Sequence, residues 1–250
     1  MPKILPAKER TQIEVGGIMM SLEIHYDWRM SVRISLAKDK AILRVPILTP
    51  PVVKEKHIEW ARLWIHKKLS KNDDLKNRYI PKEYRTNDVL KIYDKEYIFK
   101  IIEVDDRKSA SGKLIQQVIE ITIPQSATIV QRQKAISTLL SKIFSALYLP
   151  AVTKRVNEWN NLHFKKEIIR INLRNNQSNW GSCSTNKTIS ISSRLLLAPT
   201  AILDYIIVHE LAHLVHHNHS SQYWTLVEKV MPNYMEAEQW LKKNGEAIQW

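Results

Sequence analysis

The sequence predicts a protein of the α+β class, with strands in the first half of the chain and mostly helices in the second. Short β-branched segments separated by polar turns run from Ser21 to about Ile123, and such alternating segments are typical of strands. Beyond them, longer apolar segments at helical spacing surround two further strand-like segments. We therefore predict a β-rich region over residues 1–125 and a second domain over residues 126–250.

The β-rich region contains one predicted helix among its strands. KEKHIEWARLWIHKKL, residues 54–69, has apolar residues at helical spacing among basic ones, which predicts a basic amphipathic helix. The sequence shows no internal repeat and no low-complexity segment. The predicted strands are SLEIHYD, SVRISLA, KAILRVPIL, VLKIYD, EYIFKIIEV and LIQQVIEITI.

The second domain begins with a long helical segment that contains Pro150. Because proline removes a backbone donor and clashes with the preceding turn, we expect the helix to end or bend there. The strand EIIRINLR, the turn NNQSNWGS and the strand TISISS follow, and the chain then continues as helix, turn and helix to its end.

Charge and cysteine content limit the classes of function. The chain has 38 Lys and Arg against 25 Asp and Glu, a formal charge of +13, which favours contact with nucleic acid, nucleotides or another acidic surface. Cys183 is the single cysteine and cannot form an internal disulfide, and the first residues lack the apolar core of a secretion signal. No run of 18 apolar residues occurs, so we expect a cytoplasmic protein with no membrane partner.

The segment IIVHELAHLVHHNHSS, residues 206–221, contains five of the nine histidines of the chain. It lies in a predicted helix that begins near Pro199. His209 and His213 are four residues apart, so they project about 40° apart on one helical face, where both can bind one metal ion. Glu210 is rotated by about 100° from His209 and can reach a metal-bound water. This H-E-x-x-H pattern predicts a zinc site with Glu210 as general base.

The residues around this pattern favour a working site over a chance match. Short motifs also occur in unrelated helices, but here the flanking residues are apolar on nearly every side, so the helix should be buried all round. Burying two imidazoles and a carboxylate there without a function would cost several kcal/mol. The apolar neighbours are Ile206, Ile207, Val208, Leu211, Ala212, Leu214 and Val215.

A catalytic zinc ion usually takes three protein ligands and leaves one position for water. His219 is our candidate for the third ligand, although on an unbroken helix it would point away from His209 and His213. We therefore predict that the helix ends before Asn218 and that the serines after His219 cap a second helix. The alternative ligands are two carboxylates of later helices, Glu228 and Glu236.

Four further residues near the site have both a structural and a functional interpretation. His216 and His217 could hydrogen-bond an oxyanion, but we favour solvated residues at a helix end. Tyr223 could donate to an oxyanion, but an aromatic residue beside Trp224 is more typical of core packing. Cys183 could be a reactive thiol or a ligand, but nothing basic adjoins it, so we expect a buried packing residue.

Four motifs in order carry a resemblance to a known family. They are W-G-S-C-S at 180–184, R-L-L-L-A-P at 194–199, D-Y-I-I-V-H-E-L-A-H at 204–213 and N-H-S-x-x-Y-W at 218–224. Together they resemble the core of the YgjP-like metal-dependent hydrolases, which are zincin-like relatives of the SprT and WLM metallopeptidases. The opening strands and the Trp-rich basic helix resemble the family more weakly.

The resemblance implies a zincin-like metallopeptidase domain with a Zn²⁺ site formed by His209, His213 and His219, and with Glu210 as base. In such folds an edge strand beside the metal helix pairs with the substrate, and TISISS is either this strand or an interior strand of a small sheet. Asn179 stands where many relatives have a basic residue, which concerns substrate preference.

Three functions remain open. The leading one is a zinc-dependent peptidase that acts on a peptide or protein substrate. The second is a nucleoside triphosphate pyrophosphatase of the same family, although no Gly-rich phosphate loop or carboxylate cluster for magnesium is visible. The third is a nucleic-acid-binding protein with a structural metal, for which Cys183 is the only cysteine available as a fourth ligand. Glu210 argues against this last function, because a structural site needs no base.

Overall fold

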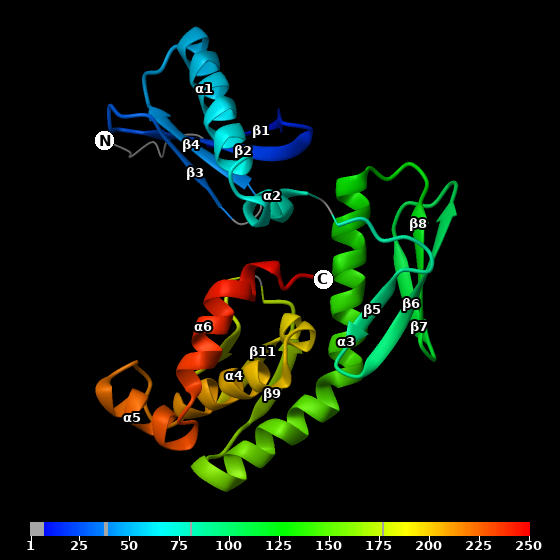
Figure 1. The fold of residues 1–250 in the computed structure, drawn as a ribbon, viewed down its shortest axis with the longest axis vertical. Helices are drawn as coiled ribbons and strands as arrows, with labels where there is room; N and C mark the ends of the chain where they lie inside the picture. Colours follow the sequence, from blue (N-terminus) through cyan, green and yellow to red (C-terminus); the bar gives the residue numbers. More distant parts are fainter. Residues whose placement is uncertain (1–7, 38–39, 81, 177) are drawn as a thin grey trace. The chain divides into compact units, whose positions relative to one another are not determined.

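The computed structural model describes residues 8–37, 40–80, 82–176 and 178–250. Its contacts divide the chain into two compact units, Met1–Pro81 and Lys82–Trp250. Small sheets and separate helices make up the described parts of both units (Figure 1), which confirms the predicted α+β class.

The first unit is a four-stranded sheet with helix α1 (Pro51–Leu69) packed on one face. The strand order is β1-β2-β4-β3, with a parallel central pair and antiparallel outer pairs. Alternate residues of the strands are buried against α1, because successive side chains point to opposite faces. A short helix, α2 (Asp73–Tyr79), follows. The strands are β1 (Lys8–Val15), β2 (Ile18–Asp27), β3 (Arg33–Leu36) and β4 (Lys40–Pro46).

Strand β1 was not predicted from the sequence. It forms a hairpin with β2 in which Val15 pairs with Ile18. Gly16 and Gly17 make the connection, and both have positive φ, at 59° and 81°. Two successive positive φ angles match the twist of a two-residue hairpin, and glycine adopts them without strain. The Gly-Gly pair was therefore a sequence signal for this hairpin.

Glu23 anchors a group of cations on the sheet face opposite α1. Its carboxylate lies 2.7 Å from Arg10, 2.9 Å from Lys40 and 3.1 Å from the ring of His25. Hydrogen bonds from Lys40 and His25 lower the pKa of Glu23 to about 2. The strands thus carry their basic residues at this face without placing unpaired charges side by side.

The second unit begins with another four-stranded sheet, which has the same design as the first. Its order is β5-β6-β8-β7, again with a parallel central pair and antiparallel outer pairs. A helix follows the last strand of each four-stranded sheet, α1 after β4 and α3 (Ile129–Trp159) after β8, so the chain contains a structural repeat that the sequence did not reveal. The strands are β5 (Val89–Ile92), β6 (Lys95–Val104), β7 (Ser111–Ile115) and β8 (Val118–Pro124). The segment LIQQVIEITI is thus split between two strands, and Gln116, with φ of 54°, lies in the turn between them.

The sequence predicted a domain boundary near residue 126, but the boundary lies between residues 81 and 82. Helix α3 (Ile129–Trp159) explains the difference. Its first half packs on the second sheet, where Ile136, Leu140 and Phe144 are buried with the residues of β5–β8. Its second half joins the same core through Val152 and Val156. One continuous core therefore links residues 82–125 to the domain that follows.

Helix α3 continues through Pro150 and does not end there. Figure 1 shows that it bends along its length, as expected where proline removes a backbone hydrogen bond. Together with the π turn η1 (Asn160–Phe164), it is long and apolar enough to cross a membrane by length and composition alone. Five residues of α3 are nevertheless buried in the core described above.

The remainder of the second unit is a three-stranded sheet covered by three helices. The strand order is β10-β11-β9, so the segment TISISS lies in the interior strand β11 and is not an edge strand. The two edge strands of this sheet are β10 and β9. The elements are β9 (Arg170–Arg174), β10 (Gly181–Cys183), β11 (Thr188–Ser192), η2 (Ser193–Leu197), α4 (Thr200–Ala212), α5 (Ser221–Val230), α6 (Tyr234–Asn244) and η3 (Gly245–Ala247).

The pairing of Glu23 predicts a pH-dependent contribution to stability. Because its pKa is lowered on folding, Glu23 should stabilise the folded chain above pH 4.5 and lose this effect as the pH falls to about 2. The difference in urea unfolding between the wild type and Glu23→Gln should therefore be full at pH 7 and much smaller at pH 2. An equal difference at both pH values would contradict the prediction.

Candidate metal centre

Helix α4 carries the H-E-x-x-H pattern through the core of the second unit. Ten of its thirteen residues are buried, as the apolar flanks of the motif predicted. The helix ends at Ala212, and His213 is its C-cap. Helix α5 begins at Ser221 after a short connection, and the hydroxyl of Ser220 accepts a hydrogen bond from the Tyr223 backbone N–H. The chain therefore leaves the helix slightly earlier than predicted, and a serine caps the next helix.

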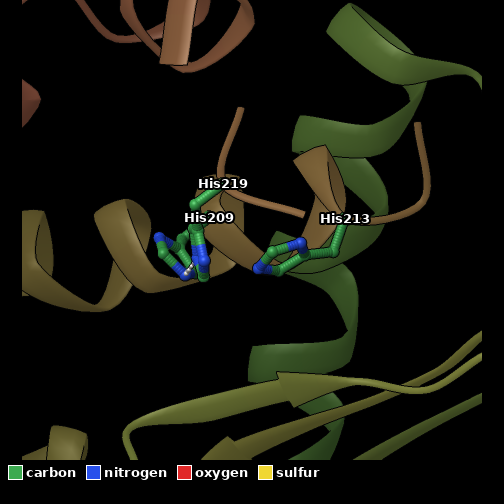
Figure 2. Close-up of side chains that lie close together, drawn as sticks. All are labelled: His209, His213 and His219. Carbon is green, nitrogen blue, oxygen red and sulfur yellow. Dashed lines mark hydrogen bonds between the residues drawn. The ribbon is translucent and has the colours of Figure 1, made fainter. Parts of the chain in front are cut away.

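The connection brings three histidines together. His209, His213 and His219 each direct a ring nitrogen to a common point, and these donor atoms all lie within 4.8 Å of one another. Figure 2 shows the three imidazole rings turned toward one another. Nε2 of His219 lies 3.2 Å from Nε2 of His209. Two nitrogens that bind one tetrahedral zinc ion at about 2.05 Å lie roughly 3.3 Å apart, so this pair fits such an ion.

The protonation of the histidines also suits a metal ion, which binds the neutral ring. Nδ1 of His213 lies 3.1 Å from the carbonyl oxygen of His216. Donation to this carbonyl places the proton on Nδ1 and leaves the lone pair on Nε2. Burial, with a further effect of His213 and His219, lowers the pKa of His209 to about 4. His216 thus serves the site through its backbone, which the sequence analysis did not foresee.

Tyr223 and Trp224 of α5 hold the rings in place. Tyr223 is fully buried, its hydroxyl donates to the carbonyl of His209 at 3.1 Å, and its ring contacts all three imidazoles. Trp224 stacks on His219 with ring centroids 5.7 Å apart. Tyr223 is therefore a core residue, as its sequence context favoured, and its packing positions the cluster.

Glu210 lies in a dry environment beside the first residue of β10. Only 4% of its surface is exposed, and this burial raises its pKa to about 8. Gly181 makes room for the carboxylate: a Cβ at this position would lie 2.7 Å from Cγ of Glu210 and closer still to Oε1. The glycine of W-G-S-C-S is thus required by close approach to Glu210.

The alternative ligands lie outside the histidine group. In the described part of the chain, the group contains neither cysteine nor carboxylate. Glu228 and Glu236 are exposed on α5 and α6. Cys183 is half-buried, and burial together with the Glu210 carboxylate raises the pKa of its thiol to about 11. A thiol of this kind stays protonated at neutral pH, so it is a poor nucleophile and a poor ligand.

An ion pair fixes α4 against α3. Asp204 lies about one and a half turns before His209. Its carboxylate accepts hydrogen bonds from Nε and Nη2 of Arg155 and, at 3.0 Å, from the indole N–H of Trp159. The hydrogen bonds to Asp204 raise the pKa of Arg155. This contact fixes the position of α4, which carries His209 and Glu210, relative to α3.

Comparison with known proteins identifies the family. The model of the YgjP-like metallopeptidase domain matches residues 29–244. The chain belongs to the YgjP-like metallopeptidase family. The YgjP-like chain is therefore a metal-dependent hydrolase of the peptidase type, as the four sequence motifs suggested. No curated protein matches it significantly.

Two solved structures share a shorter region with this YgjP-like protein. The metallopeptidase zymogen abylysin of Pyrococcus abyssi is 26% identical, with a TM-score of 0.34, over 37% of this chain and 93% of that chain. The metallopeptidase zymogen jannalysin of Methanocaldococcus jannaschii is 22% identical, with a TM-score of 0.33, over 37% of this chain and 94% of that chain.

The Asp204 anchor predicts a stability effect. Asp204→Asn should lower the free energy of unfolding by about 1–3 kcal/mol, because it leaves a partly buried guanidinium without its counter-charge. Glu158→Gln is the matched control, since Glu158 pairs with Lys154 only at the surface and should change stability by less than about 0.5 kcal/mol. Denaturant unfolding measures both, and equal effects would contradict the prediction.

Proposed function

We propose that this protein is a zinc-dependent peptidase in which His209, His213 and His219 bind the metal and Glu210 is the general base. One observation carries the proposal: the ligand nitrogens of three imidazoles lie within 4.8 Å of one another, two of them at 3.2 Å, the separation expected for two ligands of one tetrahedral ion, and the helix that supplies His209 also holds a buried carboxylate. Peptide or protein substrates follow from the family.

The residues of the chain account for the proton transfers of peptide hydrolysis. A bound zinc ion would polarise the scissile carbonyl and make the attacking water more acidic. Glu210 takes a proton from this water as oxygen bonds to the carbonyl carbon, and it gives the proton to the leaving nitrogen as the C–N bond breaks. Its burial suits both steps, since a raised pKa makes the carboxylate a stronger base and a competent acid near neutral pH.

The free edge of β10 is the proposed place for the substrate backbone. β10 ends the strand order of its sheet, and its first residue, Gly181, lies against Glu210. An extended peptide can pair with such an edge through backbone hydrogen bonds. The interior position of β11 removes the TISISS segment from this role.

The other two functions find less support. A pyrophosphatase needs cations at its phosphates, but Lys242, the lysine that lines the pocket beside His209 and Glu210, pairs with Glu238 at 3.0 Å. A structural zinc site would normally have a fourth protein ligand, and the histidine group offers none among the described residues. The basic charge of the chain supports a polyanionic partner only as a property additional to hydrolysis.

The first test compares substrates. Zinc-loaded protein, purified without a histidine tag, should release fragments from casein and no pyrophosphate from nucleoside triphosphates. Glu210→Gln should lower kcat on casein by about 100-fold to 10,000-fold, because it removes the base, while the zinc content stays the same. Unchanged activity in this variant would disprove the mechanism, and pyrophosphate release that depends on Glu210 would favour the pyrophosphatase.

Gly181→Ala tests the placement of Glu210 without touching a ligand. The added methyl group collides with the carboxylate, so kcat should fall at least about tenfold with zinc affinity unchanged. Ser182→Ala is the matched control, because the next side chain of a strand points to the opposite face. A normal kcat in Gly181→Ala would show that Glu210 acts from another position.

A further inference from the structure

A pocket opens beside the histidine cluster and is lined by three separate parts of the second unit. Its volume is about 400 Å³. The apolar walls come from Trp180 before β10, from Tyr205 and Ile206 of α4 and from Leu241 of α6, and the pocket reaches His209 and Glu210. We name it the α6 pocket.

We infer that the α6 pocket binds the substrate side chain next to the scissile bond and selects a large uncharged residue there. This inference rests on the proposed peptidase function and names its substrate class. The metal ligand and the base that act on the scissile bond are themselves part of the pocket wall. A side chain that enters the pocket therefore belongs to a residue at the attacked peptide bond.

The position of the substrate strand supports this placement. Gly181, the first residue of the edge strand β10, is also part of the pocket lining. A peptide paired with β10 would point alternate side chains to the same face. One of these side chains would meet Trp180 and Leu241, where the open pocket of about 400 Å³ has room for a leucine or phenylalanine side chain.

The wall made by Trp180 is held rigidly. The guanidinium of Arg194 lies 4.0 Å from the centre of the indole ring, and Arg194 is buried and donates to the carbonyl of Asn176 at 3.0 Å. Gly245, just after α6, lies against the same ring, because a Cβ there would be 2.8 Å from Cζ2 of Trp180. A wall fixed in this way binds an apolar group without first having to become ordered.

The charges of the α6 pocket disfavour charged side chains. Glu238 and Lys242 of α6 form an ion pair within the lining, at 3.0 Å. An acidic side chain would meet Glu238 and Glu210, and a basic one would have to displace Lys242 from its partner. An uncharged side chain loses no such interaction and gains contact with the apolar walls.

The experiment uses the full, zinc-loaded chain and peptides that differ only in the residues flanking one cleavage site. Peptides with Phe or Leu there should be cleaved with a kcat/KM at least about tenfold higher than those with Asp or Lys. Leu241→Trp fills the pocket, so it should lower kcat/KM for the Phe peptide at least about tenfold and change that for the Ala peptide less than about threefold. Gln239→Trp, at an exposed position of α6 outside the pocket, is the matched control and should keep the wild-type preference.

A second variant at Leu241 distinguishes an effect on the pocket from misfolding. Leu241→Ala enlarges the pocket and should raise the ratio of kcat/KM for Trp over Leu peptides, while thermal unfolding and zinc affinity confirm a folded, loaded protein. An unchanged preference in both Leu241 variants would overturn the inference and leave the peptidase function intact. If the wild type cleaves no peptide at all, the proposed function itself fails.

Discussion

The hydrogen bond from the Tyr223 hydroxyl to the carbonyl of His209 is the contact on which the metal centre depends. It joins the start of α5 to the last turn of α4, and the chain between these two points carries His213 and His219. The buried ring of Tyr223 also fills the space behind the three imidazoles. These contacts hold the short connection in the conformation that brings His219 back to His209 and His213.

Burial then determines the chemistry of the groups around this centre. The same dry surroundings lower the pKa of His209, raise that of Glu210 and raise that of the Cys183 thiol. Each shift favours the neutral form, because a charge loses solvation inside the protein. The result is a site with a neutral imidazole at His209, a strong base at Glu210 and no competing thiolate at Cys183. A divalent ion is the charge that such a site is suited to receive.

The rest of the second unit supports this arrangement. Helix α3 connects the second four-stranded sheet to α4, and its ion pair with Asp204 fixes the position of the metal helix. The carboxy-terminal residue Trp250 adds to this support, since it stacks on Phe144 of α3 and donates to the hydroxyl of Ser193. The first unit repeats the topology of the second sheet and helix, but its helix leads to no comparable site in the described residues.

The sequence by itself determined the α+β class, the buried helix with His209, Glu210 and His213, and the helix break that frees His219. These features follow from local chemistry: periodicity, capping serines and the fixed spacing of a helix. Tertiary structure alone decided the boundary at residue 81, the edge position of β10, the need for Gly181 and the role of the His216 carbonyl. Each of these depends on contacts between residues distant in sequence or on backbone direction, and residue patterns in a single chain do not record which surfaces meet.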